Sequence, residues 1–282
     1  MTTALATTDY LAKLQESAPP DILHLDLGMA YGQQRKYVTV KVPDSFSTLE
    51  LSMLTDMQFG HLECRVDRIK EYVDWLLSVP NRFCVLGGDM VDAAHALSVG
   101  SPYENACEPK EQVFEFAELL MPLRARILGY VGGNHERRTI KQFGSLGSLI
   151  ANLLRIPYSD GKQFIDIYFG KHAPFKVELW HGRGAARTKG ARAQMIHQFM
   201  QQGEAHLYLC GHLHDAMLLW DWRQVRDHRH GRIRLQKIAG VMSSSFLSYW
   251  ATYAEVAGLS ASDVMMARAI IEPNGHWEVT MK

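Results

Sequence analysis

The sequence has few cysteines, and none of them has the spacing of a structural zinc site. Its four cysteines are Cys64, Cys84, Cys107 and Cys210, and no two of them form a C-x-x-C pair, which argues against a zinc ribbon or finger. Cys84 and Cys210 stand inside apolar runs, where free cysteine behaves as a small buried hydrophobe. The sequence therefore gives no reason to expect disulfides.

Net charge and long apolar runs are absent as well. The 30 basic and 30 acidic residues cancel, which removes any bulk attraction to nucleic acid or membranes but leaves room for a local patch. No apolar run approaches the roughly 18–20 residues that span a bilayer, so no membrane partner is expected. The N-terminal stretch MTTALATTDYLAKLQES lacks the basic start and apolar centre of a signal peptide, and a cytoplasmic location is expected.

Apolar strands alternating with amphipathic helices are what the sequence does contain. Of its 282 residues, 47% are hydrophobic, enough for a sizeable core. Val66, Ile69, Val73 and Leu76 recur at helical spacing and predict a helix over 64–79. Such alternation predicts an α/β layered fold. Further helices are predicted over 110–121, 139–154 and 190–202, and strands over 37–42, 49–56, 82–89, 126–134, 175–182 and 205–212.

The C-terminal part has a different pattern, that of antiparallel strands around one helix near 247–257. In this helix Phe246, Tyr249, Trp250 and Tyr253 recur at i, i+3, i+4 and i+7. That spacing favours a face packed in the core over a base-stacking or partner surface. The predicted strands cover 216–222, 232–241, 264–273 and 276–281.

No internal repeat or clear linker divides the chain, so one main domain is predicted over 46–282. The first 45 residues, with a loop at 17–21, form an N-terminal appendage or belong to the same domain.

Polar side chains of one chemical kind follow five of the predicted strands. Open α/β sheets place sites at the carboxyl ends of their strands, and glycines beside each group allow a close approach to a ligand. Together these residues offer carboxylates, amides and imidazoles, a set that suits Mn²⁺, Fe or Zn²⁺. They are Asp56 and Gln58, Asp89 and Asp92, Asn134 and His135, His181, and His212 with His214.

In this order the motifs TDMQ, GGDMVD, GGNHE, WHG and GHLH resemble those of the calcineurin-like metallophosphoesterases, which are D-x-H, GDxxD, GNH[DE], a later H, and GHxH. The match is specific at four motifs of five. The resemblance implies a four-layer α/β/β/α sandwich with two facing mixed sheets. The chain also looks like phosphoesterases of phage and prophage genomes, some of which are similar to DNA-repair exonucleases.

The resemblance implies a centre of two divalent metal ions with Asp89 as the shared ligand. A carboxylate can bridge two metals, whereas a neutral imidazole cannot, so the shared ligand should be an aspartate. His135 is implied as general acid or charge stabiliser, and Asp92 as the residue that orients it or a ligand. The implied ligands are Asp56, Gln58, Asp89 and His214 for the first metal and Asp89, Asn134, His181 and His212 for the second.

Gln58 stands where the family usually has histidine. Strand alternation predicts that it points with Asp56 while Met57 points away. A neutral oxygen donor there favours manganese or magnesium over zinc; manganese is the first expectation, with zinc, iron, nickel and magnesium as alternatives. His61, beyond Gly60, is a rival ligand that would need a sharp turn, and a water molecule in place of either is the third reading.

A basic loop follows His181. Arg183, Arg187, Lys189 and Arg192 fall within GRGAARTKGARAQ, and the first three are predicted to grip a substrate phosphate, against the alternative of a solvated loop. GGNHE also resembles the protein serine/threonine phosphatase branch. That branch follows the second aspartate of GDxxD with Arg-Gly, whereas Ala93 follows Asp92 here, which speaks against it.

A second basic stretch is RQVRDHRHGRIR at 223–234. It could contact a nucleic-acid backbone, although a polar hairpin rim with Gly231 near its turn is the favoured reading.

The leading hypothesis is a metal-dependent phosphodiesterase or nuclease whose partner is a phosphoester substrate, DNA or a nucleotide. A phosphomonoesterase and a binding module that has lost catalysis are the alternatives. The sequence leaves the oligomeric state open.

Overall fold

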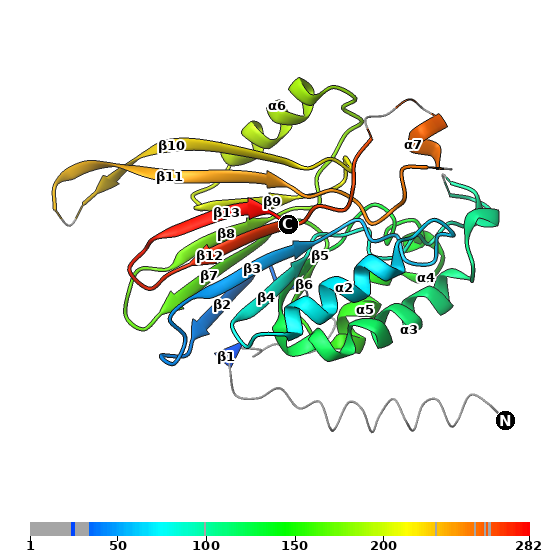
Figure 1. Ribbon diagram of the computed structural model, residues 1–282, viewed down its shortest axis with the longest axis horizontal. Helices are drawn as coiled ribbons and strands as arrows, with labels where there is room; N and C mark the ends of the chain where they lie inside the picture. The colour runs from blue at the N-terminus through cyan, green and yellow to red at the C-terminus, as the bar shows by residue number, and fades with distance from the viewer. Residues whose placement is uncertain are drawn as a thin grey trace.

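Two β-sheets pack face to face with helices on their outer sides in the computed structural model of the chain (Figure 1). The structure describes residues 24–25, 34–98, 100–228, 230–250, 252–256, 258 and 261–282. Most of the predicted N-terminal appendage, including the loop at 17–21, lies outside these residues.

One sheet has seven strands in the order β1-β2-β7-β8-β9-β11-β10. β2 pairs in parallel with β7 along its whole length, so this part of the predicted appendage is a strand of the main sheet; the boundary itself stays a prediction. The strands are β1 (His24–Leu25), β2 (Tyr37–Val42), β7 (Gln163–Phe169), β8 (Phe175–Leu179), β9 (Leu207–Cys210), β10 (Met217–Asp227) and β11 (Arg232–Met242).

The other sheet has six strands in the order β13-β12-β3-β4-β5-β6. From β3 to β6 the strands run parallel, whereas β12 pairs antiparallel with both β3 and β13. The carboxyl ends of the parallel strands therefore meet at one edge of the sheet. The strands are β3 (Leu49–Leu54), β4 (Arg82–Leu86), β5 (Ile127–Val131), β6 (Tyr158–Ser159), β12 (Ala267–Ile271) and β13 (Trp277–Met281).

Residues with a preference for helix ends mark where the helices begin. α3, for example, starts with Pro109 in its first turn and a capping box between Glu108 and Glu111. No helix in the described part of the chain is long and apolar enough to cross a membrane. The α-helices are α2 (Val66–Leu77), α3 (Pro109–Leu120), α4 (Ile140–Phe143), α5 (Leu146–Leu154), α6 (Lys189–Met200) and α7 (Tyr253–Val256), with 3-10 turns at Pro102–Glu104 and Met121–Arg126.

Strand alternation builds the layers. In β4, Phe83 and Val85 enter the core between the sheets, while Cys84 and Leu86 enter the core under α2, α3 and α5. A third cluster packs α6 against the outer face of β9 and β11. The four-layer α/β/β/α sandwich is thus confirmed, with both sheets mixed.

Two predicted helices differ from the structure. The helix over 139–154 is divided into α4 and α5, because Gly144 has a left-handed φ of 87° and Ser145 caps a new start. Of the helix over 247–257, only α7 is helical among the described residues. Phe246 is buried beneath Tyr72, but Trp250 is 69% exposed, so the reading of one core-facing helix was wrong.

Candidate metal centre

The carboxyl ends of β3, β4, β5, β8 and β9 bring the predicted polar residues together. Asp56 follows β3, Asp89 follows β4, and Asn134 follows β5 in one sheet. In the other sheet, His181 follows β8 and His212 follows β9. The side chains form two adjacent groups, each of which collects nitrogen and oxygen atoms at short distances.

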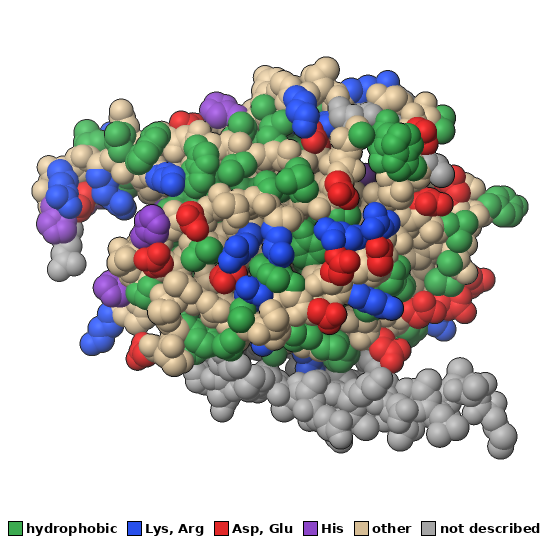
Figure 2. Space-filling view, viewed as in Figure 1, with side chains coloured by type: hydrophobic (Ala, Val, Ile, Leu, Met, Phe, Trp, Pro, Cys, Tyr) green, Lys and Arg blue, Asp and Glu red, His purple; other side chains and the backbone are tan. Residues whose placement is uncertain are grey.

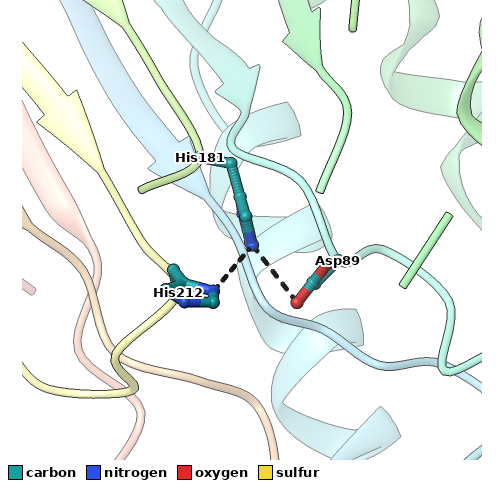
Figure 3. Close-up of side chains that lie close together, drawn as sticks. All are labelled: Asp89, His181 and His212. Carbon is teal, nitrogen blue, oxygen red and sulfur yellow. Dashed lines mark hydrogen bonds and ion pairs between the residues drawn. The ribbon is translucent and has the colours of Figure 1, made fainter. Parts of the chain in front are cut away.

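In the larger group, His181 Nε2 is at the centre of three other candidate ligand atoms. It lies 3.2 Å from Asp89 Oδ2 and 3.3 Å from His212 Nδ1 (Figure 3). It also lies 3.1 Å from Asn134 Oδ1. Ligand atoms bound at about 2.1 Å lie about 3.4 Å apart around a tetrahedral ion and about 3.0 Å apart around an octahedral one. The three distances from His181 Nε2 are thus those expected between neighbouring ligand atoms, and the ligand atoms of Asp89, His181 and His212 all lie within 4.8 Å of one another.

The outer nitrogens of both histidines are held by backbone carbonyls. His181 Nδ1 lies 2.8 Å from the Gly87 carbonyl oxygen, and His212 Nε2 lies 2.8 Å from that of Gly184. Since a carbonyl only accepts, these nitrogens donate, and the lone pairs of the neutral rings lie on His181 Nε2 and His212 Nδ1. Such contacts fix the tautomer and orientation of metal-binding histidines.

The smaller group consists of Asp56, Gln58 and His214. His214 Nε2 lies 3.2 Å from Asp56 Oδ1 and 3.2 Å from the side-chain nitrogen of Gln58. Asp56 is fully buried, and its Oδ1 makes no hydrogen bond among the described residues despite that short distance. A buried carboxylate oxygen without a hydrogen bond is costly, and a cation between it and His214 would satisfy it.

His135 and Asp92 form a pair beside the larger group. His135 Nδ1 lies 2.9 Å from the Asp92 backbone oxygen and 3.1 Å from its Oδ1, while Nε2 lies 3.6 Å from Asp89 Oδ2. Burial lowers the pKa of His135, but the carboxylates of Asp89 and Asp92 outweigh it, so the net shift is upward.

Arg138 completes this pair and was not predicted. Its guanidinium lies 2.9 Å from His135 Nε2 and donates to the Asp92 backbone oxygen at 2.7 Å. When His135 is neutral, Nδ1 therefore donates to Asp92 and Nε2 accepts from Arg138, because a guanidinium cannot accept.

The field at the centre favours a cation. Burial alone would lower the pKa of His181, but Asp89 and Asp56 raise it to about 10. Burial opposes ionisation of Asp89, yet His135 and His181 hold the pKa of this carboxyl well below its usual range. Buried carboxylates thus create a negative potential at the point on which the imidazoles converge.

Five of the predicted ligands have a left-handed backbone. They do not lie in extended strands: β3 ends at Leu54, and β9 at Cys210. The prediction that Asp56, Met57 and Gln58 continue an extended strand was therefore wrong. Met57 does point into the core, where it is fully buried. Non-glycine residues with positive φ are uncommon and gather at functional sites. The φ values are 51° for Asp56, 45° for Gln58, 53° for Asp89, 72° for His212 and 51° for His214.

Two glycines are needed because other groups occupy the space of a side chain. A Cβ atom on Gly133 would lie 2.0 Å from Asp89 Oδ1, and one on Gly211 would lie 2.2 Å from Asp56 Oδ2. The GGN and GH motifs therefore place backbone against both buried carboxylates.

Glu136 is a further residue that the site depends on. It is fully buried and accepts hydrogen bonds from the backbone nitrogens of Asp89, Met90 and Gly133 and from the Tyr130 hydroxyl. One carboxylate thus joins the turns after β4 and β5. The final position of GGNHE carried this signal, but as a sequence letter it could not be distinguished from a surface glutamate.

His61 does not join the centre. Its Nδ1 accepts from the Glu63 backbone nitrogen at 3.0 Å, and its Nε2 lies 4.0 Å from Glu104. Of the two side chains weighed for this place, it is Gln58 that lies beside Asp56 and His214, while His61 stabilises a nearby turn.

The three predicted substrate-binding cations are placed differently. Arg183 lines a cavity of about 280 Å³ together with Asn134, His181 and His212. Lys189 instead forms an ion pair with Asp215 at 3.0 Å.

Arg187 is exposed on the loop and makes no ion pair among the described residues. Arg137, which was not predicted, also lines the cavity and is exposed.

Comparison with known proteins gave similar structures only. No protein-family model and no curated protein match the chain. A metallophosphoesterase from Sphaerobacter thermophilus is 13% identical over 83% of this chain and 87% of that one, with a TM-score of 0.41. A protein serine/threonine phosphatase from Saccharomyces cerevisiae is 10% identical over 89% and 84%, with a TM-score of 0.41. An NAD nucleotidase from Haemophilus influenzae is 10% identical over 83% and 49%, with a TM-score of 0.39. TM-scores below 0.5 do not establish kinship, so the function has to be inferred from this chain's own residues.

Proposed function

We propose that the protein is a metal-dependent phosphohydrolase of the calcineurin-like kind that cleaves phosphodiesters, with nucleic acid or nucleotides as substrates. One observation carries the proposal: six candidate ligands from five strand ends, with Gln58 beside them, form two adjacent groups in which nitrogen and oxygen atoms lie 3.1–3.3 Å apart. The manganese preference, the cytoplasmic location and the phage origin stay predictions.

The donor set fits two divalent ions. Asp56, Gln58 and His214 would hold one ion, and the group around His181 the other, with Asp89 as the shared carboxylate. Asp56 Oδ1, which is buried without a hydrogen bond among the described residues, supports this fit. The chemistry that two such ions supply is charge neutralisation on the phosphate and a water activated for attack at neutral pH.

The chain's own residues supply proton transfer and orientation. His135 is buried beside Asp89, where its imidazole can stabilise negative charge on a leaving oxygen or, once Arg138 no longer donates to Nε2, hand it a proton. Asp92 holds Nδ1, and Arg138 lies against Nε2. The imidazole is thus kept in one orientation, which is the condition for efficient general acid catalysis.

Substrate would enter through the cavity beside the larger group. Arg137 and Arg183 line it next to Asn134, and both side chains can contact phosphate oxygens in bidentate fashion. Arg187 can reach the same mouth from the exposed loop. We assign Lys189 a lesser part, because its ammonium already pairs with Asp215.

The test is hydrolysis of bis(p-nitrophenyl) phosphate by the Mn²⁺-loaded protein, with bound metal measured per chain. Wild type should turn over and bind two ions, and Asp89→Asn should lose both properties while remaining folded. No hydrolysis of any mono- or diester with Mn²⁺, Zn²⁺, Fe²⁺ or Ni²⁺ would refute the proposal and leave a binding module. A higher rate on monoesters than on diesters would make the protein a phosphomonoesterase.

A further inference from the structure

A second large cavity lies at the opposite end of the seven-stranded sheet from the candidate metal centre. Its volume is about 810 Å³, and Lys176 of β8 and His206, just before β9, belong to its lining. His181 follows the same strand β8, five residues beyond Lys176. At about 3.3 Å per residue, the two sites are roughly 17 Å apart along the strand.

The cavity exists because the hairpin of β10 and β11 extends beyond its neighbours. These strands pair over eleven residues each, from Met217 opposite Met242 to Asp227 opposite Arg232. β9 pairs only with Ala239–Met242. The distal half of β11 therefore runs free of β9, and the cavity, named here the hairpin groove, lies between it and the turns at 169–176 and 271–275.

The hairpin groove is rich in cations. Lys176, Arg223, Arg226 and Arg234 line it, against the two acidic residues Glu204 and Glu272. Arg226 and Arg234 make no ion pair or hydrogen bond within the described part of the chain. Arg223 donates through Nη2 to the Met200 carbonyl and the Tyr208 hydroxyl, but its Nη1 is buried with no hydrogen-bond partner in the same residues. The guanidinium donors of Arg226 and Arg234, unpartnered in the described part of the chain and lining a concave surface, are what an anionic ligand would satisfy.

The pKa of His206 indicates the sign of the electrostatic potential in the hairpin groove. Burial and the charges of Lys176, Arg234 and Arg223 lower its pKa to about 4. The geometry agrees, because His206 Nδ1 accepts the Lys176 backbone N–H at 3.0 Å and so cannot carry a proton there. A neutral histidine surrounded by cations indicates a positive potential inside the groove.

Apolar side chains are exposed beside these cations. Trp222, Ile233 and Leu235 are 61%, 70% and 63% exposed. The register places Trp222 opposite Lys237 and Ile233 opposite Arg226, so these side chains share one face of the hairpin. Arg234, opposite Val225, projects from the other face. Figure 2 shows hydrophobic and basic side chains gathered on the projecting hairpin. Flat rings beside guanidinium groups are the usual surface for unstacked bases.

We propose that the hairpin groove and the adjoining face of the hairpin bind single-stranded nucleic acid, with Arg234 on a phosphate from one face of the hairpin and Arg226 on a phosphate and Trp222 stacking a base from the other. The charge favours this occupant over an apolar peptide, and the exposed indole favours it over a free phosphate ion. The assignment deepens the proposed function, since it makes the substrate a polymer that the protein grips away from the point of cleavage.

Binding is measured without turnover, so it does not depend on the proposed hydrolysis. A labelled oligothymidylate of about 20 nucleotides exceeds the roughly 4–16 that one binding fold covers, and it is titrated by anisotropy in chelator over a range of salt. The Arg226→Gln/Arg234→Gln variant should bind at least about tenfold more weakly. Each phosphate contact adds about 0.7 to the slope of log K against log salt, so this slope should fall by about 1.4.

A matched control removes two cations elsewhere. Lys70→Gln/Lys110→Gln changes the net charge equally on exposed positions of α2 and α3, and its affinity should equal that of wild type. Trp222→Ala should weaken binding about tenfold with the salt slope unchanged, because stacking releases no counterions.

Three outcomes overturn the proposal. They are the absence of oligonucleotide binding by wild type at low salt, equal weakening in the control variant, and binding of polyglutamate but not oligothymidylate through the same arginines. Hydrolysis of bis(p-nitrophenyl) phosphate by the groove variant, measured in parallel, reports on the proposed function alone and should match wild type.

Discussion

His181 and His206 are only 25 residues apart in sequence, belong to neighbouring parallel strands, and experience opposite fields. His181 follows the carboxyl end of β8, where Asp89 and Asp56 overcome burial and raise its pKa to about 10. His206 precedes the amino end of β9, where burial, Lys176 and two arginines lower its pKa to about 4. The same side chain thus marks an end of the sheet that attracts cations and an end that attracts anions.

The difference teaches that the two ends of neighbouring strands can have opposite electrostatic potentials within the length of one strand. At the carboxyl ends of β8 and β9, imidazoles meet carboxylates from the turns after β3 and β4 of the six-stranded sheet. At the amino ends, a long hairpin gathers arginines. The net charge of the chain is zero, so it gives no sign that negative and positive potential are separated in this way.

The largest expected effect tests whether the two ends have separate functions. His181→Gln should lower kcat/KM on bis(p-nitrophenyl) phosphate at least about a thousandfold, or about 4 kcal/mol, because the larger ligand group loses its central atom. His206→Gln should stay within about twofold of wild type. Steady-state kinetics with Mn²⁺ gives both values, and a comparable loss in the two variants would contradict the separation.

The second prediction concerns the protonation of His206 at acid pH and its effect on the free energy of unfolding. His206 has a folded pKa of about 4 against about 6.5 when unfolded, so the unfolded chain binds more protons between these values. Stability linked to this group is fully present above pH 6.5 and is lost as the pH falls toward 4. The loss is about 2–3 kcal/mol in the free energy of unfolding.

Urea unfolding at pH 7 and at pH 4.5 checks this, with His206→Asn as the comparison. The variant should lose less stability on acidification than wild type, since asparagine cannot take up the proton. Equal losses in the two proteins would show that the cations around His206 do not act on it.

The third prediction concerns Arg138, which lies against His135 at the candidate metal centre. Arg138→Gln should lower kcat about tenfold to a hundredfold on a diester with an alkoxide leaving group, which is up to the lower end of the roughly 10²–10⁴ that general acid–base catalysis contributes. On a nitrophenyl diester, whose leaving group needs no proton, the loss should be below about threefold. Lys141→Gln, an exposed cation on α4, serves as control. Equal losses of kcat on both esters would show that Arg138 supports the structure of the site and has no part in proton transfer.

The smallest effect concerns the first metal. Gln58→Ala should weaken the binding of one ion by about tenfold, the lower end of what a lost metal contact costs, whereas His61→Ala should leave both affinities unchanged. Calorimetric titration with Mn²⁺ distinguishes them. Unchanged metal affinity in Gln58→Ala would mean that water, not the amide, completes the smaller group.

Much of the fold could be predicted from the sequence because its signals are local. The spacing of Val66, Ile69 and Val73 predicted α2, and glycine-ended apolar runs predicted β4 and β5. β7 was missed, although its outward Phe164 and buried Ile165 and Ile167 give the alternation of a half-buried strand.

The candidate site was predictable in composition but not in conformation. Motif order brought Asp89, His181 and His212 to one place. The left-handed turns at Asp89 and His212, however, depend on contacts that form only in the folded chain, such as those of Glu136 with the backbone of Asp89 and Gly133. The hairpin groove has no motif, because Lys176 and Arg234 meet only through the folded sheet.

The left-handed turns that carry Asp56, Asp89 and His214 have a consequence for the lifetime of the chain. Backbone strain of this kind costs about 1–3 kcal/mol per residue, in a class of molecules whose total margin is about 5–15 kcal/mol. Ions that bind only the folded form offset that cost by an amount that rises with the logarithm of their concentration. We therefore expect metal supply to govern how long the protein survives proteolysis, so that a shortage of metal lowers the amount of folded protein.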